Sequence, residues 1–118
     1  MTDKEKLEQF LNEQKYMVLA VTLDDGTPWA VPVRIQLFRE RAFEWDSRID
    51  AVHSEAIAKR PAGAITIFDK SSDSEIGFYA KGKAVLVEEY KPEYGRYRFV
   101  TSQCWMNDET FVKREIEL

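Results

Sequence analysis

The chain has 118 residues, of which 44% are hydrophobic and 32% charged, and its formal net charge is −4. This length predicts one domain over residues 1–118, and the composition is typical of a globular protein. The negative charge argues against nucleic acid as a partner, and no apolar run reaches the roughly 20 residues of a membrane span. A single histidine and a single cysteine leave no ligand set for a zinc or redox-metal site.

The first expected element is a helix over Thr2–Gln14. Thr2 or Asp3 can cap it, and its apolar stripe at helical spacing consists of Leu7, Phe10 and Leu11. Because this polar segment lacks the apolar core of a signal peptide, we expect the protein to stay in the cytoplasm.

Three strands follow in the expected order. Residues 16–23 are apolar almost throughout, which suits a strand covered on both sides, and Asp24-Asp25-Gly26 is a hairpin turn signal. A second strand is expected over residues 28–38. The chain should reverse at Arg39 and Glu40 and continue in a third strand over residues 42–47.

A second helix is expected over Asp50–Lys59, with Asp50 as its N-cap and Pro61 marking its end. Its apolar stripe should consist of Ile49, Val52, Ala56 and Ile57. Beyond a polar loop at 70–74 and a bulge at Gly82, the remaining strands are predicted over residues 62–68, 76–88, 97–106 and 111–116. Long strands, short connections and only two helices favour a mainly β, antiparallel barrel over an α/β sheet.

The second and third strands predict a surface with mixed chemistry. If they fold back at residues 39–40, Arg34 lies opposite Trp45 and Gln36 lies opposite Phe43. The other face of the second strand is apolar and should enter the core; it carries Trp29, Val31, Val33, Ile35 and Leu37. The outward face suits a flat, hydrogen-bonding ligand or a partner subunit. A one-residue slip would move every group to the opposite face.

The third strand runs directly into the second helix, where a phosphate site is conceivable. Ser47 stands at the strand end, and His53 and Ser54 fall in the first helical turns, where the helix dipole favours an anion. An aromatic strand face for a planar group, next to a phosphate site at the helix start, would suit a mononucleotide such as FMN. Plainer interpretations stay open: a structural His53, a turn-forming Ser47, a Trp45 that only covers the barrel, and a ligand-free dimer contact at Arg34 and Gln36.

The order of these motifs resembles the small FMN-binding split-barrel proteins related to pyridoxamine 5'-phosphate oxidase. The resembling motifs are the N-terminal helix, DDGTPWAVPVRIQ, FEWDS, DAVHSEAIAKRP and YAKGKAVLVEE, which span most of the chain from Leu7 to Glu89. The segment RYRFVTSQCWMND is similar to the family's closing strands. The resemblance implies an antiparallel split β-barrel that binds FMN on its outside, at a homodimer interface.

The resemblance also implies which residues contact the cofactor. Carried over by position, the residues that would line the flavin ring are Val33, Arg34, Ile35 and Gln36. Those that would border the ribityl and phosphate groups are Trp45, Asp46 and Ser47, and those that would hold the phosphate are His53 and Ser54. Larger relatives often have an arginine–lysine pair where this chain has Val52 and His53, and short members commonly have asparagine at the position of Ala56. A histidine ligand would make FMN binding depend on pH.

The C-terminus FVKREIEL does not resemble the arginine-rich strand with which the full oxidase recognises pyridoxal phosphate. We therefore expect an FMN-dependent oxidoreductase acting on an unidentified small molecule other than vitamin B6. Two alternatives remain: a flavin-storing protein without turnover, and a flavin-free dimeric interaction module. No catalytic residue is assigned, since Tyr79, Tyr97 and Cys104 are each more often core or surface than proton donors.

Overall fold

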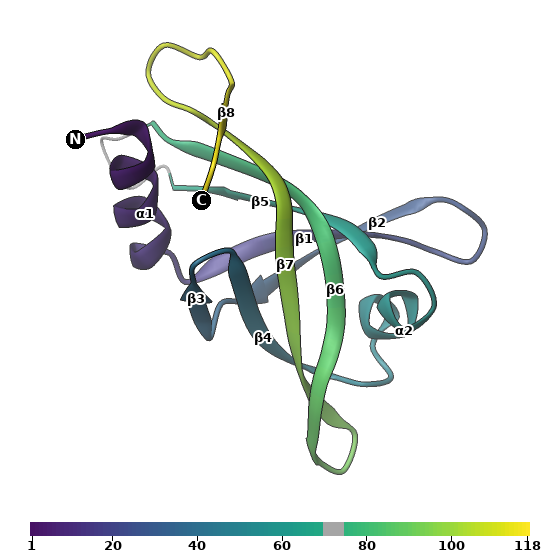
Figure 1. The fold of residues 1–118 in the computed structure, drawn as a ribbon. Helices are drawn as coiled ribbons and strands as arrows, with labels where there is room; N and C mark the ends of the chain where they lie inside the picture. The colour runs from purple at the N-terminus through teal and green to yellow at the C-terminus, as the bar shows by residue number, and fades with distance from the viewer. Residues whose placement is uncertain (70–74) are drawn as a thin grey trace.

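The computed structural model describes residues 1–69 and 75–118, so the loop expected at 70–74 lies outside the described residues. The strands are β1 (Tyr16–Thr22), β2 (Pro28–Arg34), β3 (Leu37–Arg39), β4 (Ala42–Arg48), β5 (Ala62–Phe68), β6 (Gly77–Lys91), β7 (Tyr94–Asn107) and β8 (Arg114–Ile116). The helices are α1 (Asp3–Glu13) and α2 (Val52–Lys59). The strands form one antiparallel sheet in the order β2-β1-β5-β6-β7-β4-β3, with β8 paired to β7 (Figure 1).

The two edges of this sheet meet because they are consecutive in sequence. β2 ends at Arg34, β3 begins at Leu37, and the bend between them is fixed by two backbone hydrogen bonds. The N–H of Ile35 donates to the carbonyl of Lys15 at 2.7 Å, and the N–H of Gln36 donates to the carbonyl of Glu44 at 2.8 Å. The sheet thus curls into an open, split barrel with two helices, which confirms the predicted fold class.

The helix α1 forms as the sequence predicts. Thr2 caps it, and the Thr2 and Glu5 side chains each accept a hydrogen bond from the other residue's backbone N–H. The predicted apolar stripe is buried against the barrel, where it consists of Leu7, Phe10 and Leu11. Local capping and periodicity therefore suffice to specify this element.

The start and the buried face of α2 differ from the prediction. Ala51 occupies the N-cap without a side-chain hydrogen bond, because the carboxylate of Asp50 instead accepts two hydrogen bonds from Arg48. Val52, expected in the core, is 47% exposed. The residues of α2 that are buried are His53, Ser54, Ala56 and Ile57.

Gly82 marks a bulge, as predicted. The β6–β7 register shifts between Lys81 and Gly82, and a Cβ at Gly82 would lie 2.0 Å from the carbonyl oxygen of Val100. Only glycine tolerates this close approach. A second register shift lies between Leu86 and Glu88, and Leu86 is exposed.

The expected continuous strand over residues 28–38 is wrong in one consequential respect. At Ile35 and Gln36 the chain bends, and the inward-facing positions change from odd numbers (Val31, Val33) to an even one, Phe38. Phe38 pairs with Phe43, and their rings stack with centroids 4.7 Å apart. The turn falls at Glu40 and Arg41. Leu37, which was expected to face the core, is exposed.

Candidate functional site

The β2 part of the predicted site keeps its expected orientation. Arg34 and Gln36 are exposed, and the Arg34 guanidinium carbon lies 5.8 Å from the centroid of the Tyr16 ring. Val33 is buried in the core, and Ile35 is half-buried against it. A ligand on the outside of β2 would therefore meet the side chains of Arg34 and Gln36 and only the backbone of Val33.

The β4 part has the opposite orientation from the one expected. Phe43 and Trp45 are both 0% exposed, and the Trp45 ring stacks on Tyr97 inside the barrel with centroids 5.8 Å apart. The expectation that these aromatic rings face outward is wrong, because the bend at Ile35 and Gln36 shifts the inward positions by one residue. The Trp45 side chain is closed off from any ligand on the barrel exterior.

The outward face of β4 instead carries carboxylates that pair with β7. The Arg98 Nε donates to Glu44 Oε2 at 2.7 Å, and the Arg96 guanidinium donates to both Glu44 and Asp46. The Arg98 guanidinium holds the pKa of the Glu44 carboxyl below its usual range. Sequence reasoning missed this ladder, although Arg96 and Arg98 alternate in step with the two acids.

The strand end and the helix start do converge. Ser47 Oγ, at the end of β4, lies 2.9 Å from Nε2 of His53 in the first turn of α2. Burial lowers the pKa of the His53 imidazole below its ordinary value. A neutral imidazole and a hydroxyl can each donate or accept a hydrogen bond, so this pair can adapt to a polar ligand.

The start of α2 has no side-chain cap. The N-cap Ala51 supplies no side-chain acceptor for the N–H groups of the first turn. The nearby cation Arg48 is held by Asp50 at 2.9 Å and by Glu93 at 2.7 Å. The chemistry of this donor set fits an oxyanion bound through hydrogen bonds from a hydroxyl, an imidazole and backbone N–H groups, rather than through a free guanidinium.

Ser54 is separate from the Ser47–His53 pair. Its side chain is 2% exposed, and its hydroxyl has no hydrogen-bond partner within the described structure. The structure thus brings Ser47 and His53 together without joining Ser54 to them, and its assignment to the phosphate stays a prediction.

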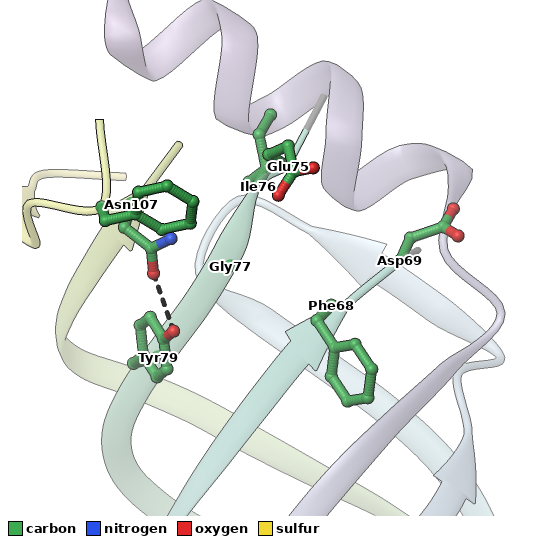
Figure 2. A pocket seen from close by; sticks show the side chains of 8 residues that line it. Phe68, Asp69, Glu75, Ile76, Gly77, Tyr79 and Asn107 are labelled. Atoms are coloured by element: carbon green, nitrogen blue, oxygen red, sulfur yellow. Dashed lines mark hydrogen bonds between the residues drawn. The ribbon is translucent and has the colours of Figure 1, made fainter. Parts of the chain in front are cut away.

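A different cavity lies at the α1 end of the sheet. Figure 2 shows its lining, where the Tyr79 hydroxyl donates to Asn107 Oδ1 at 2.7 Å beside Gly77. Its volume is about 450 Å³, and the residues predicted to bind the cofactor are not among those that line it. We assign this cavity no role.

The described residues contain neither a metal-binding cluster nor a membrane-spanning helix. Within residues 1–69 and 75–118, no three His, Cys, Asp or Glu side chains gather in a way that could hold a metal ion. In the same ranges, no helix combines the length and the apolar character needed to cross a membrane.

The fold and the polar helix start are those of a split-barrel protein, and comparison with known families gives the same class. The sequence profile of the pyridoxamine 5'-phosphate oxidase family matches residues 3–117. The chain therefore belongs to that family. No curated protein matches the chain in sequence.

Solved structures share the fold at low identity. A Clostridium acetobutylicum protein related to general stress protein 26 superposes with a TM-score of 0.82 at 9% identity, covering 100% of this chain and 97% of its own. A heme-binding protein from Mycobacterium smegmatis gives 0.83 at 15% identity, covering 99% of this chain and 58% of its own. An F420 reductase gives 0.69 at 14% identity, covering 82% and 94%. At these identities the likeness establishes the fold alone.

Proposed function

We propose that this chain is an FMN-dependent oxidoreductase that acts on a small molecule, with FMN bound on the outside of the barrel. The flavin ring lies along the exposed edge of β2, next to Arg34 and Gln36. The phosphate lies at the start of α2. FMN supplies the redox chemistry by accepting a hydride at its ring, while the chain's own residues bind and orient it.

The observation that carries this proposal is the 2.9 Å contact between Ser47 and His53. It joins the end of β4 to the start of α2 at a helix terminus that has no side-chain cap. Hydroxyl, imidazole and backbone donors at one point suit a phosphate. Proteins of the same fold include both an F420 reductase and a heme-binding protein, so the fold is compatible with an oxidoreductase and with a cofactor-binding protein.

The proposal includes a homodimer with FMN at the subunit interface. An apolar hollow of about 360 Å³ lies on the outer face of the sheet, over β2, β1, β5, β6 and β7. Its lining includes Val18, Ala20, Ala30, Ala64 and Trp105. Solvent-facing sides of antiparallel sheets are usually polar, so an apolar one favours burial against a second subunit.

The decisive experiment is the visible spectrum of the purified protein, followed by titration with FMN. A flavin spectrum, or saturable quenching of FMN fluorescence, is expected. A colourless protein that takes up no added FMN would refute the cofactor assignment and favour the flavin-free dimer.

Two variants locate the phosphate end. Ser47→Ala and His53→Ala should each weaken FMN binding by about tenfold, as expected for the loss of a hydrogen bond to a charged group. Ser102→Ala is the matched control, because Ser102 is an exposed β7 residue that donates to the carbonyl of Lys81. Equal affinities in all three variants would contradict the placement of the phosphate.

Enzymatic turnover requires a separate test. The FMN-loaded protein is mixed with NADH or NADPH without oxygen, and flavin absorbance is followed. Bleaching by either nucleotide supports the oxidoreductase. A flavin that neither nucleotide reduces points to storage or to another electron donor.

A further inference from the structure

A cavity between α2 and the β6–β7 ribbon lies apart from the Ser47–His53 pair. Its volume is about 480 Å³, within the range usual for small-molecule sites. Its walls are largely apolar and include Ile57, Pro61, Leu86 and Tyr97. Figure 1 shows α2 beside β6.

One side of α2 faces this cavity. The lining residues Ser54, Ile57, Ala58 and Pro61 recur at spacings of three and four, which places the helical ones on a single stripe. The opposite side of the helix faces the β1–β2 hairpin, where Val52, Glu55 and Lys59 line a separate hollow. The side of α2 that faces the first cavity is therefore mostly apolar, whereas the opposite side carries the charged residues Glu55 and Lys59.

The apolar side contains one buried polar group, the Ser54 hydroxyl. The side chain is 2% exposed, and its oxygen has no hydrogen-bond partner in the part of the chain that the structure describes. Buried hydroxyls are almost always paired, and leaving one unpaired costs stability. Ser54 is one of the residues that line the cavity, but its hydroxyl oxygen is enclosed by protein atoms, so a ligand reaches it only after the side chain rotates about its Cα–Cβ bond.

The charge at this cavity is negative. Glu89, an exposed residue of β6, also lines it. A carboxylate beside an apolar cavity repels an anionic ligand, and a buried anion would lose its hydration without a cation to compensate. The cavity thus disfavours fatty acids and other carboxylates and accepts uncharged molecules.

We infer that this cavity binds a neutral, mostly apolar small molecule that carries one hydrogen-bonding group, which pairs with the Ser54 hydroxyl once that side chain rotates toward the cavity. The inference does not rest on the proposed flavin function, since neither Ser47 nor His53 lines the cavity. It assigns to Ser54 a role different from the phosphate contact implied by the family resemblance.

Two fluorescent probes of nearly identical shape test the inference. N-phenyl-1-naphthylamine is neutral and carries one N–H, and 1-anilinonaphthalene-8-sulfonate is the same molecule with an added sulfonate. The neutral probe should bind saturably to the full chain, and the sulfonate should bind at least about tenfold more weakly. Equal or stronger binding of the sulfonate would overturn the inference.

Matched variants show where the probe binds. Ala58→Phe places a large ring at the cavity and should weaken binding of the neutral probe more than about tenfold. Glu55→Phe adds the same ring on the opposite side of α2 and should leave it unchanged. Ser54→Ala should weaken it about three- to tenfold through loss of one hydrogen bond. If Ala58→Phe and Glu55→Phe act alike, or if Ser54→Ala binds as well as the native chain, the assignment is wrong.

Competition with FMN separates this inference from the proposed function. Saturating FMN should leave the affinity for the neutral probe unchanged within twofold or so, whether or not FMN itself binds. Displacement of the probe by FMN would place both ligands in one site and overturn the inference of a second one.

Discussion

The strands β2 and β4 were expected to share one ligand-facing surface, and they have opposite constructions. β2 and the bend after it place Arg34 and Gln36 near solvent, and β2 turns its valines toward the core. β4 places its aromatic rings in the core and its carboxylates outside, paired with Arg96 and Arg98. The difference teaches that a strand's pattern predicts its two faces, whereas the bend before it decides which of them faces the core.

The largest expected effect contrasts the tryptophans of the two strands. Trp45→Ala should lower the free energy of unfolding by about 3–5 kcal/mol, because it empties a fully buried site in the barrel. Trp29→Ala, on β2, should cost less than about 1 kcal/mol, because that ring is 43% exposed. Urea unfolding of both variants measures the difference. Similar losses of unfolding free energy in the two variants would contradict the claim that the two strands bury opposite kinds of face.

The outward faces give the next contrast, between two arginines. Arg96→Ala should cost about 1–2 kcal/mol, because it leaves Glu44, which is 8% exposed, with one of its two guanidinium partners. Arg34→Ala on β2 should cost less than about 0.5 kcal/mol, since Arg34 is exposed over the Tyr16 ring.

The measurement for both arginine variants is the midpoint of urea unfolding in low and in high salt. Salt should reduce the difference between the native chain and the Arg96→Ala variant only partly, because the pair is partly shielded from solvent. A loss in Arg34→Ala as large as in Arg96→Ala would mean that the outer face of β2 is also held by a charged network.

These contrasts show which parts of the site the sequence could predict. Ser47 and His53 are six residues apart, and a short connection from strand to helix suffices to bring them together. The orientation of Trp45 could not be predicted in the same way. It depends on the bend at Ile35 and Gln36, which is fixed by backbone bonds to the distant Lys15 and Glu44.

The start of α2 gives the same lesson at short range. Asp50 has the chemistry of an N-cap, and a capping motif predicts it to bind the first-turn N–H groups. Arg48 competes for the same carboxylate and also reaches Glu93 on the far hairpin. The capping preference of Asp50 is thus overruled by Arg48, two residues earlier in the chain, and Glu93, 45 positions beyond Arg48, holds the same guanidinium. Thr2, which has no such competitor for its capping box, behaves as predicted.

A smaller stability effect is expected at Ser54. Ser54→Ala removes a buried hydroxyl that has no partner in the described structure, and it should raise the free energy of unfolding by about 1 kcal/mol. Ser47→Ala, at the end of β4, should lower it slightly, because that hydroxyl is bonded to His53. Thermal unfolding of the ligand-free protein distinguishes the two signs. A loss of stability in both variants would show that the Ser54 hydroxyl is paired in solution.

The smallest effect concerns pH at the strand ends. Burial lowers the pKa of His53 in the folded protein below the ordinary value of about 6.5. Between these two pKa values the unfolded chain binds more protons, so the free energy of unfolding should fall as pH drops below about 6.5 and continue to fall until the folded pKa is reached.

The test is the urea midpoint of the native chain and of His53→Gln between pH 7.5 and about 5. Glutamine keeps hydrogen-bonding capacity beside Ser47 but does not titrate, so the variant should lose less stability than the native chain over this window. The carboxylates titrate equally in both proteins and cancel in the difference. Parallel curves of urea midpoint against pH would mean that His53 is solvated in the folded state. The end of β4 would then be as exposed to solvent as the end of β2.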